Sequence, residues 1–226
     1  MKLLKSAGLI LGLALVATAF LAVGSASAET TKLCRVNEEK CSKANTYALG
    51  FENFKGAAIS SPEEAKLVMP GLVTVSCPTG KLASTLKETT GALLGEVSKW
   101  NTFNCTPAAS KCTLLPPKEI ETGYTAEVTA TGGGNGSLVI GGGGGPELIA
   151  KCPAGSPVTT CIYTAPTIKF TVKGGPGGGA GKNPQVSTEA SMTKVPFGSS
   201  AFCPNTATYV LLYQMVEPGS ALFITH

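Results

Sequence analysis

The sequence predicts an all-β protein, an antiparallel β-sandwich held by disulfides and carrying long glycine-rich loops. Three observations lead to this fold class. Apolar and polar residues alternate with a period of two in several short segments, which is typical of strands with one buried face. Prolines and glycines, 15 and 28 of the 226 residues, interrupt these segments at short intervals. Eight cysteines, an even number, can cross-link them.

The first 28 residues are expected to be a secretory signal peptide. Lys2 and Lys5 make its start positive, residues 8–23 are apolar and uncharged, and residues 26–28 form a small-x-small cleavage site. Because the apolar stretch is short and ends in small residues, we expect no transmembrane anchor in the mature chain. Residues 29–226 are then expected to be a single disulfide-stapled all-β domain, secreted or held at the cell surface.

The first regular element predicted in the mature chain is a short helical turn in residues 61–70. Ser61 can cap this turn, Pro62 suits the first helical position and Glu64 completes a capping box.

Strands follow this turn. Residues 72–77 form a short β-branched run, and residues 124–131 alternate regularly. Residues 95–105 are expected to be a strand whose alternation breaks near Trp100, where a bulge is one explanation. Further short strands are predicted at residues 138–140, 148–152 and 222–225.

Two later segments have the strongest strand patterns. In residues 167–173, Ile168, Phe170 and Val172 share one face, and lysines and threonines share the other. Residues 208–216 are apolar on both faces and are bounded by turn residues. We therefore expect this last segment to be a central strand.

Two glycine tracts, residues 131–146 and 173–184, are expected to contain flexible loops between strands. The second tract resembles a phosphate-binding loop only superficially. Pro176 stands where the first glycine of that motif belongs, and Asn183 replaces its hydroxyl residue. We therefore expect no nucleotide site and no cofactor.

The cysteines are expected to form disulfides rather than metal or redox sites. Structural zinc sites use closer cysteine spacing and often histidine, and dithiol redox sites use C-x-x-C, which this chain lacks. Sequence alone cannot choose among the 105 pairings of eight cysteines. Proximity along the chain suggests Cys34–Cys41, Cys105–Cys112 and Cys152–Cys161, which leaves Cys77–Cys203.

Composition argues against several function classes. Cleavage of the leader removes two of the 18 basic residues and no acidic one, so the formal net charge falls from +4 to +2. This weak, scattered charge does not predict nucleic-acid binding. The chain has no aspartate and one histidine, His226, so a Ser-His-Asp hydrolase and an aspartate-rich calcium loop are not expected.

A glycan-active protein is the remaining alternative. Glycoside hydrolysis needs only two carboxyl groups, which glutamates can supply. The candidate glutamates are Glu38, Glu39, Glu63, Glu64, Glu119 and Glu121. A carbohydrate-binding face would need exposed aromatic residues, although aromatic residues on strands more often belong to the core. The candidates are Trp100, Tyr124, Tyr163, Tyr209 and Tyr213.

The cysteine pattern resembles that of a group of uncharacterised secreted proteins of high-GC Gram-positive bacteria. The matching residues are Leu33, Cys34, Cys41, Asn45, Tyr47, Gly50, Cys105, Cys112, Cys152, Cys161, Cys203 and Pro204. The resemblance implies a disulfide-bonded, secreted protein and assigns no functional residue. The sequence therefore predicts an extracellular or cell-envelope structural or binding protein without catalysis, whose partner is an unidentified envelope glycan or protein.

Overall fold

The computed structural model describes residues 29–49, 54–58, 64–103, 105–107, 113–115, 123–152, 159–177, 182–217 and 221–226 of the chain. Several predictions fall outside the described residues, namely those on the signal peptide (residues 1–28), Ser61, Pro62, Glu63, Cys112, Glu119 and Glu121.

Regular secondary structure in the described part of the chain is β-strand, as the sequence predicts. The strands are β1 (Lys32–Cys34), β2 (Phe54–Ala58), β3 (Glu64–Met69), β4 (Val73–Cys77), β5 (Thr79–Glu88), β6 (Leu93–Phe103), β7 (Thr106–Pro107), β8 (Thr113–Leu115), β9 (Thr125–Gly132), β10 (Asn135–Gly141), β11 (Glu147–Cys152), β12 (Thr159–Thr164), β13 (Thr167–Lys173), β14 (Gln185–Lys194), β15 (Thr206–Glu217) and β16 (Phe223–Thr225).

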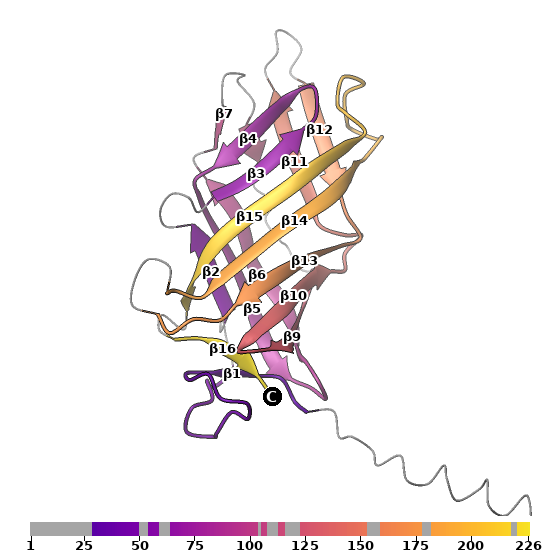
Figure 1. Cartoon of the computed structure of the whole chain (residues 1–226). Coiled ribbons are helices and arrows are strands. Elements are labelled where there is room, and N and C mark those ends of the chain that lie inside the picture. Colours follow the sequence, from indigo (N-terminus) through magenta and orange to yellow (C-terminus); the bar gives the residue numbers. More distant parts are fainter. Residues whose placement is uncertain are drawn as a thin grey trace, which may run out of the picture.

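Fourteen of these strands form one antiparallel sheet in the order β7-β4-β3-β15-β2-β5-β6-β9-β10-β13-β14-β12-β11-β8. Strands β1 and β16 pair separately, at the end of the molecule where the C-terminus lies (Figure 1). The chain is therefore all-β and antiparallel, as predicted.

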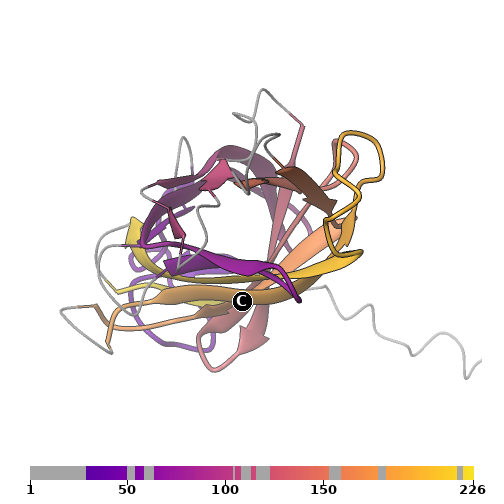
Figure 2. The same cartoon turned by 90° about the horizontal axis from the view of Figure 1, so that it is seen from above.

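The β-sandwich is the part of the fold prediction that needs correction, because the main sheet is one layer that curls on itself rather than two facing sheets (Figure 2). An additional pairing of β15 with β14 joins the two ends of the series β15-β2-β5-β6-β9-β10-β13-β14, which we call the eight-strand ring. Strands twist, and long strands let the twist accumulate until a sheet curls on itself. Alternation of apolar and polar residues shows which face is buried, but not whether that face meets a second sheet or the same one.

Strand β15 has paired strands along both of its edges, which confirms the prediction of a central strand at residues 208–216. One edge pairs with β14 from Thr206 to Gln214, and the other pairs first with β3 and then with β2. Tyr209, Leu211 and Tyr213 are buried on one face.

The other strand predictions agree with the structure, and the predicted helical turn does not. Residues 64–69 form β3, in which Ala65, Leu67 and Met69 are buried in alternation. Pairing with both β4 and β15 stabilises the extended backbone of this segment. Strands appear at each remaining predicted position, namely β4, β6, β9, β10, β11, β13 and β16.

The irregularity predicted near Trp100 is present in β6. Ala83 of β5 faces Lys99, whereas the next residue, Ser84, faces Val97. Ser98 is therefore the extra residue of a bulge, two positions before Trp100.

Aromatic side chains from separate strands fill the interior of the eight-strand ring. The Trp100 ring of β6 lies 6.0 Å from the Phe170 ring of β13 and 6.0 Å from the Tyr209 ring of β15. Trp100 Nε1 donates a hydrogen bond of 3.4 Å to the Tyr209 hydroxyl. Because these strands are not neighbours in the ring, the contacts cross its interior and make it a packed core.

Gly95 allows β5 and β6 to approach closely. A Cβ at this position would overlap the carbonyl oxygen of Thr85 on the neighbouring strand. We expect Gly95→Ala to lower the free energy of unfolding by about 3 kcal/mol or more, because the overlapping atoms belong to paired backbones that cannot move apart without losing hydrogen bonds.

Gly71 provides a matched control, to be compared by urea denaturation. It has a φ of +73° and nothing within 4 Å of an added Cβ. Gly71→Ala should cost only about 1 kcal/mol of backbone strain. Equal losses for the two variants would contradict the close-approach explanation.

The buried tyrosines make stability sensitive to alkaline pH. Burial raises the pKa of Tyr163 to about 12 and raises the pKa values of Tyr209 and Tyr213 as well. A raised pKa means that the folded state favours the neutral phenol. The resulting contribution to the free energy of unfolding is fully present below pH 10 and is lost as the pH rises through the folded-state pKa values. We expect the free energy of unfolding to fall from about pH 10 upward.

Tyr213→Phe tests this expectation, because the Tyr213 hydroxyl is buried and has no hydrogen-bond partner among the described residues. The variant should be at least as stable as the parent at pH 7, since an unpaired buried hydroxyl is destabilising. Because burial raises the pKa of Tyr213, the variant should also lose less stability than the parent as the pH rises above about 10, measured by urea denaturation at each pH. If the variant lost as much stability above pH 10 as the parent does, Tyr213 would not be a source of the alkaline sensitivity.

Candidate binding surfaces

Three disulfides join described cysteines: Cys34–Cys41, Cys77–Cys105 and Cys161–Cys203, with sequence separations of 7, 28 and 42 residues. The first is a pair that proximity along the chain suggested. The structure contradicts three other suggested pairs, namely Cys77–Cys203, Cys105–Cys112 and Cys152–Cys161. Cys152 is also disulfide-bonded. Disulfides in this number suggest an oxidising environment.

Proximity along the chain fails because the curled sheet brings distant segments together. Cys161 lies in β12, and β12 pairs with the end of β14 through Tyr163 and Thr164. The connection from β14 to β15 then turns back beside β12, which places Cys203 next to Cys161.

Two of the glutamates proposed as catalytic acids, Glu38 and Glu64, have local structural roles. Glu38 accepts hydrogen bonds from the backbone amide of Ser42 and from Asn45 Nδ2, and these bonds lower its pKa. Glu64 forms an ion pair with Lys66, two residues along β3. Glu39 is exposed.

His226, the single histidine of the chain, lies beside Glu29. Its Nδ1 is 3.3 Å from the carbonyl oxygen of Glu29. Among the described residues, no three histidine, cysteine, aspartate or glutamate side chains form a group that could hold a metal ion.

The aromatic residues proposed as a glycan-binding face belong mostly to the core, which was the other interpretation of the sequence. Trp100, Tyr163, Tyr209 and Tyr213 are buried. Tyr124 is half-buried, with its ring 6.5 Å from that of Trp100. These residues therefore do not form a flat exposed row.

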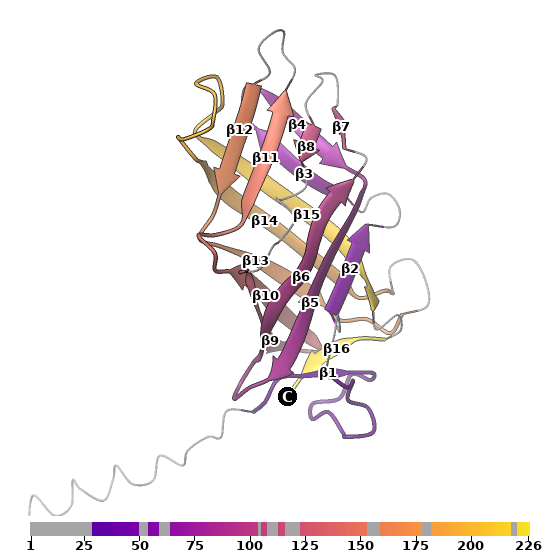
Figure 3. The ribbon, with the colours of Figure 1, turned by 180° about the vertical axis from the view of Figure 1, so that it is seen from behind.

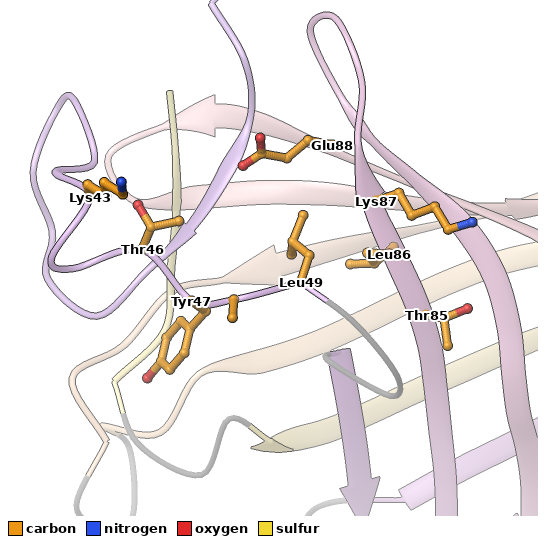
Figure 4. A pocket seen from close by; sticks show the side chains of 9 residues that line it. Lys43, Thr46, Tyr47, Leu49, Thr85, Leu86, Lys87 and Glu88 are labelled. Atoms are coloured by element: carbon orange, nitrogen blue, oxygen red, sulfur yellow. The ribbon is translucent and has the colours of Figure 1, made fainter.

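One candidate surface is a groove of about 980 Å³, which we call the end groove (Figure 4). Residues 43 and 46–49 line one side, and Thr85, Leu86, Lys87 and Glu88 at the end of β5 line the other. Leu49 contributes apolar surface between the two sides, above the buried Leu86. The Glu88 carboxylate faces the side on which Lys43 lies, whereas Lys87 points away.

Several interactions fix the loop that forms one wall of the end groove. The Cys34–Cys41 disulfide closes the segment that precedes this loop. The Tyr47 hydroxyl donates a 2.7 Å hydrogen bond to the carbonyl oxygen of Ala221, and the Arg35 guanidinium lies 4.4 Å from the centre of the Tyr47 ring.

The second candidate surface is the connection between β14 and β15, residues 195–205, which we call the Phe loop. Phe197 and Phe202 are 92% and 81% exposed, far more than any other large apolar side chain among the described residues. The sequence of the loop, VPFGSSAFCPN, contains no charged residue. Sequence analysis missed this feature, although two phenylalanines in a stretch rich in glycine, serine and proline, without strand alternation, are a signal for it.

The Phe loop is attached to the neighbouring strand along its length. The Val195 amide donates to the Ile162 carbonyl and the Ser200 amide to the Thr160 carbonyl, both at 2.8 Å. The Cys161–Cys203 disulfide then joins the loop to β12 covalently.

Side chains at the ends of the loop add to this attachment. Lys194 Nζ donates a 2.9 Å bond to the Cys203 carbonyl, and the Tyr163 hydroxyl donates a 3.1 Å bond to the Pro204 carbonyl. The fold therefore holds the two exposed phenylalanines on a constrained loop.

Comparisons with known proteins assign no family to this chain. No protein-family model matches it, and searches of curated proteins and of solved structures found no match either. In the described ranges, no helix has the length and apolar character needed to cross a membrane.

The Cys161–Cys203 disulfide should contribute more stability than the short Cys34–Cys41 disulfide, because it closes a longer loop in the unfolded chain. For separations of 42 and 7 residues, the chain-entropy model gives about 4 and about 2.5 kcal/mol. The double variants Cys161→Ala/Cys203→Ala and Cys34→Ala/Cys41→Ala, compared by urea denaturation, measure the two contributions. A larger loss in the second variant would be inconsistent with this explanation.

Proposed function

We propose that this chain is an exported, non-catalytic binding protein that holds a partner outside the cell through the Phe loop. The observation that carries this proposal is the pair of exposed phenylalanines, Phe197 and Phe202, on a loop attached by a disulfide and several hydrogen bonds. Large aromatic side chains are usually buried, and an exposed apolar patch is typical of an interaction site.

The constrained loop suits binding for an energetic reason. Removing one phenylalanine side chain from water contributes about 1.5–3 kcal/mol. Because the Cys161–Cys203 disulfide and the bonds to β12 already order the loop, little conformational entropy would be lost when a partner binds.

Three features support export of the mature chain, residues 29–226. Residues 1–28, which precede it, have the pattern of a signal peptide, disulfides suggest an oxidising environment, and the cysteine pattern resembles that of secreted bacterial proteins. Release from the cell or retention at the envelope is compatible with each of them.

The alternative prediction of a glycan-active protein has weaker support. Its proposed aromatic residues mostly lie in the core, and Glu88 is the only carboxylate among the described residues that line the end groove. Hydrolysis of a glycosidic bond typically requires a pair of carboxyl groups, one on each side of the bond that is cleaved.

Capture from native cell-envelope extracts tests the binding role. We expect immobilised mature protein to retain a specific partner and Phe197→Ala/Phe202→Ala to retain at least tenfold less, since truncating an aromatic anchor typically costs more than a factor of ten in affinity.

Leu94→Ala is the matched control, because Leu94 is an exposed apolar residue outside the loop. It should retain the partner as well as the parent does, and thermal denaturation should show that all three proteins are folded. Equal retention by the parent and the loop variant would refute the role of the Phe loop.

A further inference from the structure

We propose that the partner of the Phe loop is a second copy of this chain, whose end groove receives Phe197 and Phe202. This inference rests on the proposed binding role of the loop and specifies the partner. It predicts that the protein associates head to tail.

The end groove suits an uncharged, apolar occupant. Leu49 and Ala48 give it apolar surface above the buried Leu86, and its wall residues Glu88 and Lys43 carry opposite charges. Its volume of about 980 Å³ lies at the upper end of the range of sites that enclose drug-sized molecules, which is ample for two phenyl groups.

The Phe loop has the matching character. None of its eleven residues is charged, and its two large side chains are apolar and exposed. Docking would therefore bury no unpaired charge from the loop. It would also remove apolar surface of both partners from contact with water, which favours binding.

The two surfaces lie at opposite ends of the molecule. The connection from β14 to β15 lies at the end where β12 and β4 are seen, whereas the end groove lies near β1 and β16 (Figures 1 and 3). A chain cannot fill its own groove across this distance, so docking requires another copy. Because the two contacting surfaces differ, each added copy presents a new free loop and a new free groove, and an open series of copies results.

The buried area predicts weak association. One aromatic side chain buries 150–250 Å² at most, so the pair contributes about 300–500 Å² on one partner. Stable interfaces bury about 800 Å² on each partner. Head-to-tail contacts should therefore form in a concentration-dependent way, at high micromolar protein.

A lipid surface is a less suitable occupant for the Phe loop. Segments that bind membranes usually combine apolar side chains with basic residues that attract anionic lipids. The loop has no basic residue, and the adjacent Lys194 directs its ammonium group to the Cys203 carbonyl.

Sedimentation velocity of the mature protein over about 1 μM to 1 mM tests the proposal, since weak interfaces of this size have affinities in that range. We expect the parent to form dimers and longer series as its concentration rises. Phe197→Ala/Phe202→Ala should reduce the association constant about a hundredfold, with a factor of ten for each ring.

Ala48→Arg is the complementary variant, because Ala48 lines the end groove and is exposed, so a charged side chain there obstructs the groove without entering the core. It should be monomeric over the same range. Lys169→Ala, on the exposed face of β13, is the control and should associate like the parent.

Mixing the two monomeric variants distinguishes head-to-tail docking from other modes. The loop variant keeps an intact groove and the groove variant keeps an intact loop, so the mixture should form one-to-one heterodimers and nothing longer. The proposal is overturned if the parent stays monomeric, if the mixture gives no heterodimer, or if Ala48→Arg alone still dimerises through paired Phe loops.

A vesicle experiment completes the test and keeps the two proposals separate. If the parent stays monomeric and binds phosphatidylcholine–phosphatidylglycerol vesicles, whereas the loop variant does not bind them, a lipid surface is the occupant and self-association is overturned. If self-association is absent while partner capture from the envelope still depends on the phenylalanines, the binding role stands and only this inference fails.

Discussion

The pairing of β14 with β15 is the constraint on which the rest of the structure depends. Nine residue pairs, from Gln185 and Gln214 to Thr193 and Thr206, join these strands. Without them, the fourteen strands would form one open series from β7 to β8, with β15 and β14 eight positions apart counted inclusively. Their pairing closes the eight-strand ring and so creates an interior in which Trp100 meets Phe170 and Tyr209.

Closure also determines where the cross-links lie. The connection that returns from β14 to β15 passes beside β12, and Cys161–Cys203 joins the two there. Each exposed phenylalanine thus belongs to a segment that both the sheet and a disulfide hold in place. At the other end, the Cys34–Cys41 disulfide and the Tyr47 contacts fix one wall of the end groove. The two candidate binding surfaces therefore lie at opposite ends of the molecule, each beside a disulfide.

Local patterns predicted much of this structure, and their failures have a common cause. The alternation in residues 167–173 is a property of neighbouring residues, and β13 has the buried face that it predicts. The capping pattern near Glu64 is equally local, but two neighbouring strands pair with this segment and stabilise the extended form. The sandwich was the wrong architecture because alternation shows that a face is buried without showing what covers it.

The sequence by itself determined the strand class and the buried face of the strand at residues 167–173, because these depend on side-chain periodicity. Proximity along the chain also gave the correct partner for Cys34 but the wrong one for Cys105, although both suggested pairs have the same separation. Only the tertiary structure decided the closure of the sheet, the partners of Cys77 and Cys161, and the exposure of Phe197 and Phe202. These features depend on which distant segments become neighbours. That arrangement results from the register and twist of the whole sheet, which no single segment of the chain contains.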